Sequence, residues 1–135
     1  MYDYYANPDT FSDAARFSDS SPTGNAEDAE RKIDINSLQT QIEAYYAGNG
    51  NYPSLSQMNN ASWRATNMKS LDSAALKDPQ GSSQQLAAKP VDKSYSYFVT
   101  SNDGKSCEAD ALNCTTYTLT ASLSDHTVYT KTNLD

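Results

Sequence analysis

The sequence lacks long apolar runs. No stretch approaches the roughly 20 apolar residues that a membrane-spanning helix needs, and none resembles a signal peptide. Leucine, isoleucine and valine are few, whereas tyrosine occurs ten times among 135 residues. The chain is therefore predicted to form one domain with a small, partly aromatic core.

Positive charge is also scarce. Ten basic side chains stand against seventeen acidic ones, which gives a formal net charge of −7. This balance disfavours binding to nucleic-acid phosphates or to anionic lipid surfaces. It favours a soluble, self-repelling surface, and we expect no nucleic-acid partner.

Metal-ligating and redox-active side chains are rare. The two cysteines, Cys107 and Cys114, lie seven residues apart, and with His126 as the only histidine they are too few for a structural zinc site. We interpret them as a disulfide, which would contribute about 2–3 kcal/mol and imply an oxidising compartment. Two unpaired thiols in a cytosolic protein are the alternative.

The strongest pattern is a helix over residues 25–49. Asn25 is the expected N-cap, Glu27 and Arg31 are an expected pair one turn apart, and Gly48 and Gly50 are expected to end the helix. One stripe of the helical wheel is apolar and is predicted to face the core; it consists of Ile35, Leu38, Ile42, Tyr45 and Tyr46.

The first half of this helix has a second apolar side, formed by Ala26, Ala29 and Ile33, opposite the core stripe. Two apolar sides imply two partners. One hypothesis is that the N-terminal segment of the same chain folds over Ile33. The other is that these three residues contact another subunit.

The last third of the chain alternates apolar and polar residues over 94–99, 116–123 and 127–131, which predicts three antiparallel strands. The expected fold class is α+β, with the long helix packed on this sheet and an irregular connector over 54–93 between them. Tyr52, Tyr97, Tyr117 and Leu119 are predicted to complete the core. We expect residues 1–25 to be a partly ordered segment, with one short helix near Thr10, and residues 26–135 to be the globular domain.

Several motifs resemble one family when taken in order. They are Glu30-Arg31-Lys32, Tyr45-Tyr46, NGNYP at 49–53, LKDPQG at 76–81, Tyr95-Ser96-Tyr97 and Tyr117-Thr118-Leu119-Thr120. Together they resemble the soluble domain of type IV pilins and of the related type II secretion pseudopilins, over roughly residues 26–132. The resemblance implies a long helix on a three-stranded antiparallel sheet. It also implies a hydrophobic helix directly before residue 25, which this sequence does not show; a fragment from which that helix was removed would explain the difference.

The resemblance implies a structural subunit and not an enzyme. Our leading hypothesis is a type IV pilin in an extracellular cell-surface filament used for adhesion or motility. Its partners would be other pilin subunits and, through the absent helix, the pilus assembly machinery in the membrane. The resemblance to pilins implies a disulfide near the C-terminal end of the sheet, whereas Cys107 and Cys114 would close an earlier hairpin; a major pseudopilin would usually lack one, which favours the pilin.

Two alternatives stay open. The first is a type II secretion pseudopilin whose assembly depends on calcium, because Asp103, Glu108 and Asp110 concentrate oxygen ligands in one loop. The second is a secreted carbohydrate-binding module that uses Trp63 and the tyrosines, although a lone Trp beside Met58 and Met68 more often packs against a core. Asp125-His126 is the only pair that suggests base catalysis, and a lone histidine in a turn is usually solvated.

Overall fold

The computed structural model describes residues 22–134, with side chains from Gly24 onward. The predicted short helix near Thr10 lies outside the described residues, as does most of the predicted N-terminal segment. Among residues 22–134, no helix is long and apolar enough to cross a membrane.

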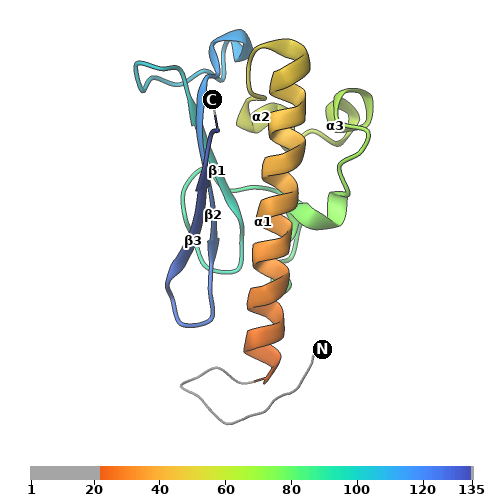
Figure 1. The fold of residues 1–135 in the computed structure, drawn as a ribbon, viewed down its shortest axis with the longest axis vertical. Helices are drawn as coiled ribbons and strands as arrows, with labels where there is room; N and C mark the ends of the chain where they lie inside the picture. Colours follow the sequence, from red (N-terminus) through yellow and green to blue (C-terminus); the bar gives the residue numbers. More distant parts are fainter. Residues whose placement is uncertain (1–21, 135) are drawn as a thin grey trace.

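The architecture is one long helix laid along a three-stranded sheet, with the connector wrapped around both (Figure 1). The helices are α1 (Pro22–Asn49), α2 (Leu55–Met58) and α3 (Ala61–Asn67), with 3-10 turns η1 (Ser73–Leu76) and η2 (Ala111–Asn113). The strands are β1 (Ser96–Thr100), β2 (Thr116–Ser122) and β3 (Val128–Thr132). This arrangement is the predicted α+β fold of the pilin type.

Helix α1 begins three residues before the predicted start. Pro22 is its first residue, a position where proline costs little because the missing amide would have no helical partner. Asn25 therefore lies inside the helix and is not its cap, which corrects the prediction. The other end is as expected: the amide of Gly50 donates to the carbonyl of Tyr46 at 2.8 Å, and Gly50 has a φ of 81°.

The sheet is an antiparallel meander in the order β1-β2-β3, with Tyr97 opposite Leu119 and Ala121 opposite Tyr129. Alternate residues of β1 and β2 point toward α1. Tyr97, Tyr117 and Leu119 are fully buried there, together with Ile35, Leu38 and Ile42 of the helix and Tyr52 just after it. Tyr45 and Tyr46 are only half-buried; Tyr45 packs edge-on against Trp63, and Tyr46 stacks on Tyr52.

Glu43 of α1 connects the helix to the sheet. Its carboxylate accepts hydrogen bonds from the hydroxyl groups of Tyr117 at 2.6 Å and Tyr52 at 3.1 Å, and from the amide of Leu134 at 3.1 Å. Buried hydroxyl groups need such partners, since an unpaired one costs about 1–3 kcal/mol. The aromatic core that the composition predicts is thus stabilised by a carboxylate at its edge.

The connector contains more regular structure than its sequence suggests. Ser54 caps α2 by accepting from the amide of Gln57. Residues 73–76 form the 3-10 turn η1, and a turn at 78–81 closes with a hydrogen bond from the amide of Gly81 to the carbonyl of Asp78. Helix α3 was not predicted.

Candidate functional site

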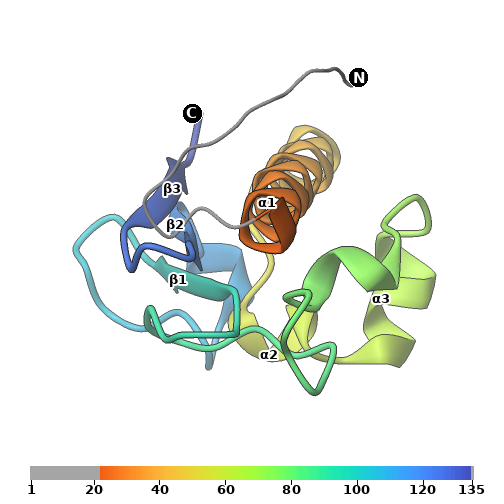
Figure 2. The ribbon, with the colours of Figure 1, turned by 90° about the horizontal axis from the view of Figure 1, so that it is seen from below.

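The first half of α1 carries an exposed apolar ridge, which we define as Ala26, Ala29 and Ile33. All three side chains are exposed, and Ile33 has 66% of its surface accessible. They lie on the side of α1 away from the buried stripe. Figure 2 shows α1 with the sheet on one side and the connector on another, which leaves a third side of the helix uncovered by either.

A buried ion cluster fixes the orientation of this half of α1. Arg31 donates through Nε to Asp78 Oδ2 at 2.9 Å and through Nη2 to Asp78 Oδ1 at 3.2 Å, so the contact is bidentate. Nη1 donates to Asp28 Oδ1 at 2.7 Å. Arg31 and Asp78 are 4% and 1% exposed. The hydrogen bond to Asp78 raises the pKa of Arg31 above its ordinary value, against the effect of burial.

The cluster joins three parts of the chain that are distant in sequence. Asp28 Oδ1 also accepts from the amide of Ser124 in the turn between β2 and β3, and Ser124 Oγ contacts the carbonyl of Gly24. Arg31 therefore pairs with Asp28 and Asp78, and not with Glu27 as predicted; Glu27 accepts from Gln80 instead. The first half of α1, which carries the ridge, is therefore attached to the connector on one side and to the β2–β3 turn on the other.

Asp34, one turn further along α1, has an unusual pKa. Burial raises it from 3.8 to about 6, although a hydrogen bond of 2.6 Å from the hydroxyl of Tyr95 favours the charged form. The proton is thus bound more tightly in the folded chain than in the unfolded one. Protonated Asp34 therefore stabilises the folded chain in full below about pH 4, and this stabilisation is lost as the pH rises through about 6.

Replacing Asp34 with asparagine should therefore stabilise the domain near neutral pH, because the amide oxygen can still accept from Tyr95 and carries no charge. Since Asp34 is half-buried and screened by solvent, we expect a gain of about 1 kcal/mol at pH 7.5 and almost none at pH 3.5. Urea unfolding at the two pH values measures both. The exposed Asp92→Asn is the control, and an equal gain at both pH values would contradict the assignment.

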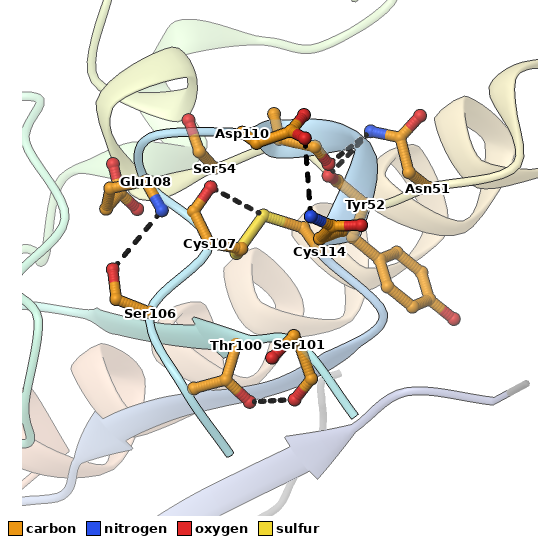
Figure 3. The surroundings of a disulfide bond; sticks show 12 residues. Asn51, Tyr52, Ser54, Thr100, Ser101, Ser106, Cys107, Glu108, Asp110 and Cys114 are labelled. Carbon is orange, nitrogen blue, oxygen red and sulfur yellow. Dashed lines mark hydrogen bonds between the residues drawn. A yellow bond between two sulfur atoms is a disulfide. The ribbon is translucent and has the colours of Figure 1, made fainter. Parts of the chain in front are cut away.

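The disulfide predicted from Cys107 and Cys114 is present (Figure 3). Their Cα atoms are 5.3 Å apart, and both side chains are buried. The amide of Tyr52 donates to the carbonyl of Cys114 at 2.7 Å, and Asn51 Nδ2 donates to the carbonyl of Ala111 at 2.9 Å. The disulfide loop, residues 101–114, is in this way attached to the segment that follows α1.

Glu108 in the same loop holds the start of α2. Its carboxylate accepts from the amides of Leu55 at 2.7 Å and Ser56 at 3.0 Å, and from Ser56 Oγ at 2.7 Å. Burial opposes ionisation, but these hydrogen bonds outweigh it and lower the pKa of Glu108. The carboxylate acts as a cap for α2 supplied from a distant loop.

The three candidate calcium ligands are not brought together. Glu108 is engaged by α2, Asp103 accepts from Ser101 Oγ and from the amide of Lys105, and Asp110 accepts from the amide of Leu112. Within residues 22–134, no three side chains of His, Cys, Asp or Glu are grouped as a metal site would require. The loop considered as an alternative calcium site is closed by the predicted disulfide and by these local hydrogen bonds.

The remaining candidates for chemistry lie apart from one another. His126 occupies the tight β2–β3 turn with a φ of 69° and a side chain that is 82% exposed, 4.0 Å from Asp92. Asp125 is engaged by the amide of Thr127 at 3.0 Å. Trp63 packs against the core and meets Tyr45 edge-on, with ring centroids 5.2 Å apart. Trp63 is thus placed as a packing residue.

Sequence reasoning missed the Arg31–Asp78 contact. The two residues are 47 positions apart, and each had a sufficient local interpretation, Arg31 as a helix surface charge and Asp78 as a turn residue. The available signal was that the turn at 78–81 begins with an acidic residue in a connector that otherwise carries more basic than acidic side chains.

The long helix, the three-stranded antiparallel sheet and the irregular connector between them define a pilin-like domain. The family profile described as type II secretion system (T2SS), protein G, matches residues 20–112, which is more than half of the chain. The protein therefore belongs to the type II secretion protein G family, a family of pseudopilins. Searches of curated proteins and of solved structures found no match. The family match supports the pilin and pseudopilin superfamily, and it does not support a type IV pilin specifically.

Proposed function

We propose that this protein is a pseudopilin-type subunit of a filament in the cell envelope, and that it assembles with other pilin-like subunits and with secretion machinery. The observation that carries the proposal is the exposed ridge on a helix that is fixed to the rest of the domain. An isolated Ile would need no explanation. An exposed Ile with two alanines on one side of a rigidly held helix, in a chain of the protein G family, supports a contact with another subunit on that side.

The proposed role is structural and not catalytic. Asp125 and His126 lie in an exposed turn, with no buried nucleophile beside them among the described contacts. The proposed polymerisation uses heterologous contacts, in which one face of a subunit meets a different face of the next, so that the assembly grows as a helix. The net negative charge would keep free subunits apart before assembly.

Replacing Ile33 with aspartate should abolish filament assembly in cells that express the natural gene, because a charge would then be buried between subunits. The folded domain should be unaffected, with a change within about 0.5 kcal/mol, since Ile33 is largely exposed. Electron microscopy of sheared filaments and urea unfolding of the purified domain measure the two effects.

Ser62→Asp, on the exposed side of α3, introduces the same charge on another helix and serves as the control. Normal filaments in the Ile33 variant would contradict the proposed interface. Loss of filaments in both variants would show that added charge acts unspecifically, and it would equally remove support for the ridge.

A type IV pilus subunit for adhesion or motility is the second candidate, favoured by the disulfide that closes the loop after β1. The two functions predict different phenotypes for deletion of the gene. Loss of a secreted protein from the medium with surface pili intact supports the pseudopilin. Loss of surface pili with secretion intact supports the pilus subunit.

A further inference from the structure

An exposed aromatic ring, that of Phe98, lies on the face of the sheet turned away from α1. Its neighbours in β1, Tyr97 and Val99, are buried in the core, whereas Phe98 is 51% exposed. A hollow of about 300 Å³ lies between Phe98, Thr118 and residues 88–90. A second hollow, of about 200 Å³, reaches from Phe98 toward the disulfide loop. We call this surface the Phe98 face.

Hydroxyl groups without partners lie beside this ring. Thr118 of β2 stands opposite Phe98 in the sheet, and Thr132 of β3 stands opposite Thr118, so the three residues form a row across the strands. In the part of the chain that the structure describes, the side chains of Thr118 and Thr132 make no hydrogen bond. The next row is satisfied internally, because the hydroxyls of Ser96 and Thr120 bond to each other. The row at Phe98 therefore offers a ring and two hydroxyl groups to a ligand.

The charge beside Phe98 is positive and unpaired. Lys89 lines the larger hollow and is exposed, and it has no ion-pair partner within residues 22–134. Among the described residues that line this hollow, none is acidic. The smaller hollow is lined by Glu108, whose carboxylate is held by the amides of Leu55 and Ser56. An anionic group is therefore favoured next to Lys89 in the larger hollow and disfavoured in the smaller one.

A pyranose sugar that carries a carboxylate matches these three kinds of group. Its C–H face can stack on an aromatic ring, its hydroxyls can bond to threonine, and its carboxylate can pair with an ammonium. The hollows are at or below the lower end of the range of about 300–1,000 Å³ that is typical of small-molecule sites, which suits single rings.

The overall charge of the chain restricts the ligand further. With a net charge of −7, the protein repels a polymer that has a carboxylate on every ring. A polymer in which acidic rings alternate with neutral ones can place a carboxylate at Lys89 and a neutral ring near Glu108. Alternation therefore fits the uneven charge of the two hollows.

We propose that the Phe98 face binds a polysaccharide in which uronic acids alternate with neutral sugars. One pyranose ring stacks on Phe98, hydroxyl groups of the sugar bond to Thr118 and Thr132, and the carboxylate of an acidic unit pairs with Lys89. The inference goes beyond the proposed filament function and does not depend on it, because α1 and its ridge lie on the other side of the sheet (Figure 2).

An NMR titration of the purified chain tests the proposal, with a short hyaluronan oligosaccharide as the probe. In this probe glucuronic acid alternates with N-acetylglucosamine, and an N-acetylglucosamine oligomer of the same length is the neutral comparison. We expect amide shifts centred on Phe98, Thr118 and Thr132. The acidic probe should bind about fivefold more tightly than the neutral one at low salt, as one exposed ion pair allows, and the difference should vanish at high salt.

Two substitutions separate the ring from the charge. Phe98→Leu keeps an apolar side chain but removes the ring, and it should weaken the binding of both probes by about tenfold. Lys89→Gln should weaken only the acidic probe, by about fivefold, and leave the two probes equal. The matched controls are Leu112→Ala, at another exposed apolar side chain, and Lys69→Gln, at another exposed lysine of the connector. Neither control should change the binding of either probe.

Absence of shifts at millimolar concentrations of both probes would overturn the proposal, as would binding that Phe98→Leu does not weaken. Equal binding of the two probes to the native chain would overturn it too, because Lys89 would then not select an acidic sugar. Self-association of the chain that Phe98→Leu abolishes would mean that a second copy covers this face, and it would also overturn the proposal. None of these results bears on the filament function, which the Ile33→Asp experiment tests separately.

Discussion

Replacing Asp78 with alanine is expected to lower the free energy of unfolding by about 3–5 kcal/mol, because it leaves the guanidinium of Arg31 buried with half of its partners removed. Arg31 is 4% exposed, and Asp78 supplies two of its three hydrogen bonds, at 2.9 and 3.2 Å. Asp28 at 2.7 Å would remain, but it is also engaged by Ser124. A loss of this size is a large fraction of the stability of a small domain.

Urea unfolding followed by circular dichroism measures this loss, and Asp92→Ala is its control. Asp92 is also an acidic residue of the connector, but its side chain is 69% exposed and contacts only His126, at 4.0 Å. Its removal should change the stability by less than about 0.5 kcal/mol. A similar small effect from Asp78→Ala would mean that the ion cluster does not hold α1 against the connector.

Removing the disulfide should cost about 2–3 kcal/mol, and adding calcium should change nothing. The value of about 2–3 kcal/mol is the entropy cost that the disulfide removes by closing a short loop in the unfolded chain. In the folded chain the same loop is also attached to the segment after α1 by Asn51 and Tyr52, and to α2 by Glu108. The variant is Cys107→Ser with Cys114→Ser. Thermal unfolding of both proteins, with calcium and with a chelator, gives the four values needed.

The two mechanisms of loop closure make opposite predictions for these four values. A disulfide-closed loop gives a large difference between the proteins and no difference between calcium and chelator, because Asp103, Glu108 and Asp110 are each engaged by other groups. A calcium-closed loop raises the melting temperature of the native protein when calcium is added. That second result would restore the calcium-dependent pseudopilin that the sequence suggested.

The elements with strong periodicity were predictable. Helix α1 and strands β1, β2 and β3 were expected within a few residues of their observed ends, because an apolar stripe at helical spacing and strict alternation each have one simple structural solution. The start of α1 was predicted wrongly because Asn25 is a good cap residue. Pro22 is also a favourable first residue of a helix, and the observed helix begins there.

Elements without periodicity were not predictable. Helix α3 has a single large apolar residue, Trp63, and it is instead defined by the cap at Asn60, whose side-chain oxygen accepts from the amide of Trp63 at 3.0 Å. Its buried Arg64 donates to the carbonyl of Met58 at 2.6 Å, and burial lowers the pKa of Arg64. A buried arginine cannot be foreseen from a polar sequence, since tertiary contacts alone decide it.

The outer face of the sheet also differed from expectation. Strand alternation implies one buried and one solvated face, yet Ser96, Thr100 and Thr120 on the second face are also buried. Residues 86–91 fold back along β1, where Ala87 pairs with Ser96, and cover part of that face. The cover is incomplete, because Phe98 on the same face stays half-exposed, and only the three-dimensional structure reveals this.

Electron cryomicroscopy of the filaments formed by the product of the natural gene tests the central claim most directly. The account predicts successive copies related by a helical operation, with Ala26, Ala29 and Ile33 of each copy buried against its neighbour. Filaments in which the uncovered side of α1 faces solvent, with subunits joined through other surfaces, would contradict it.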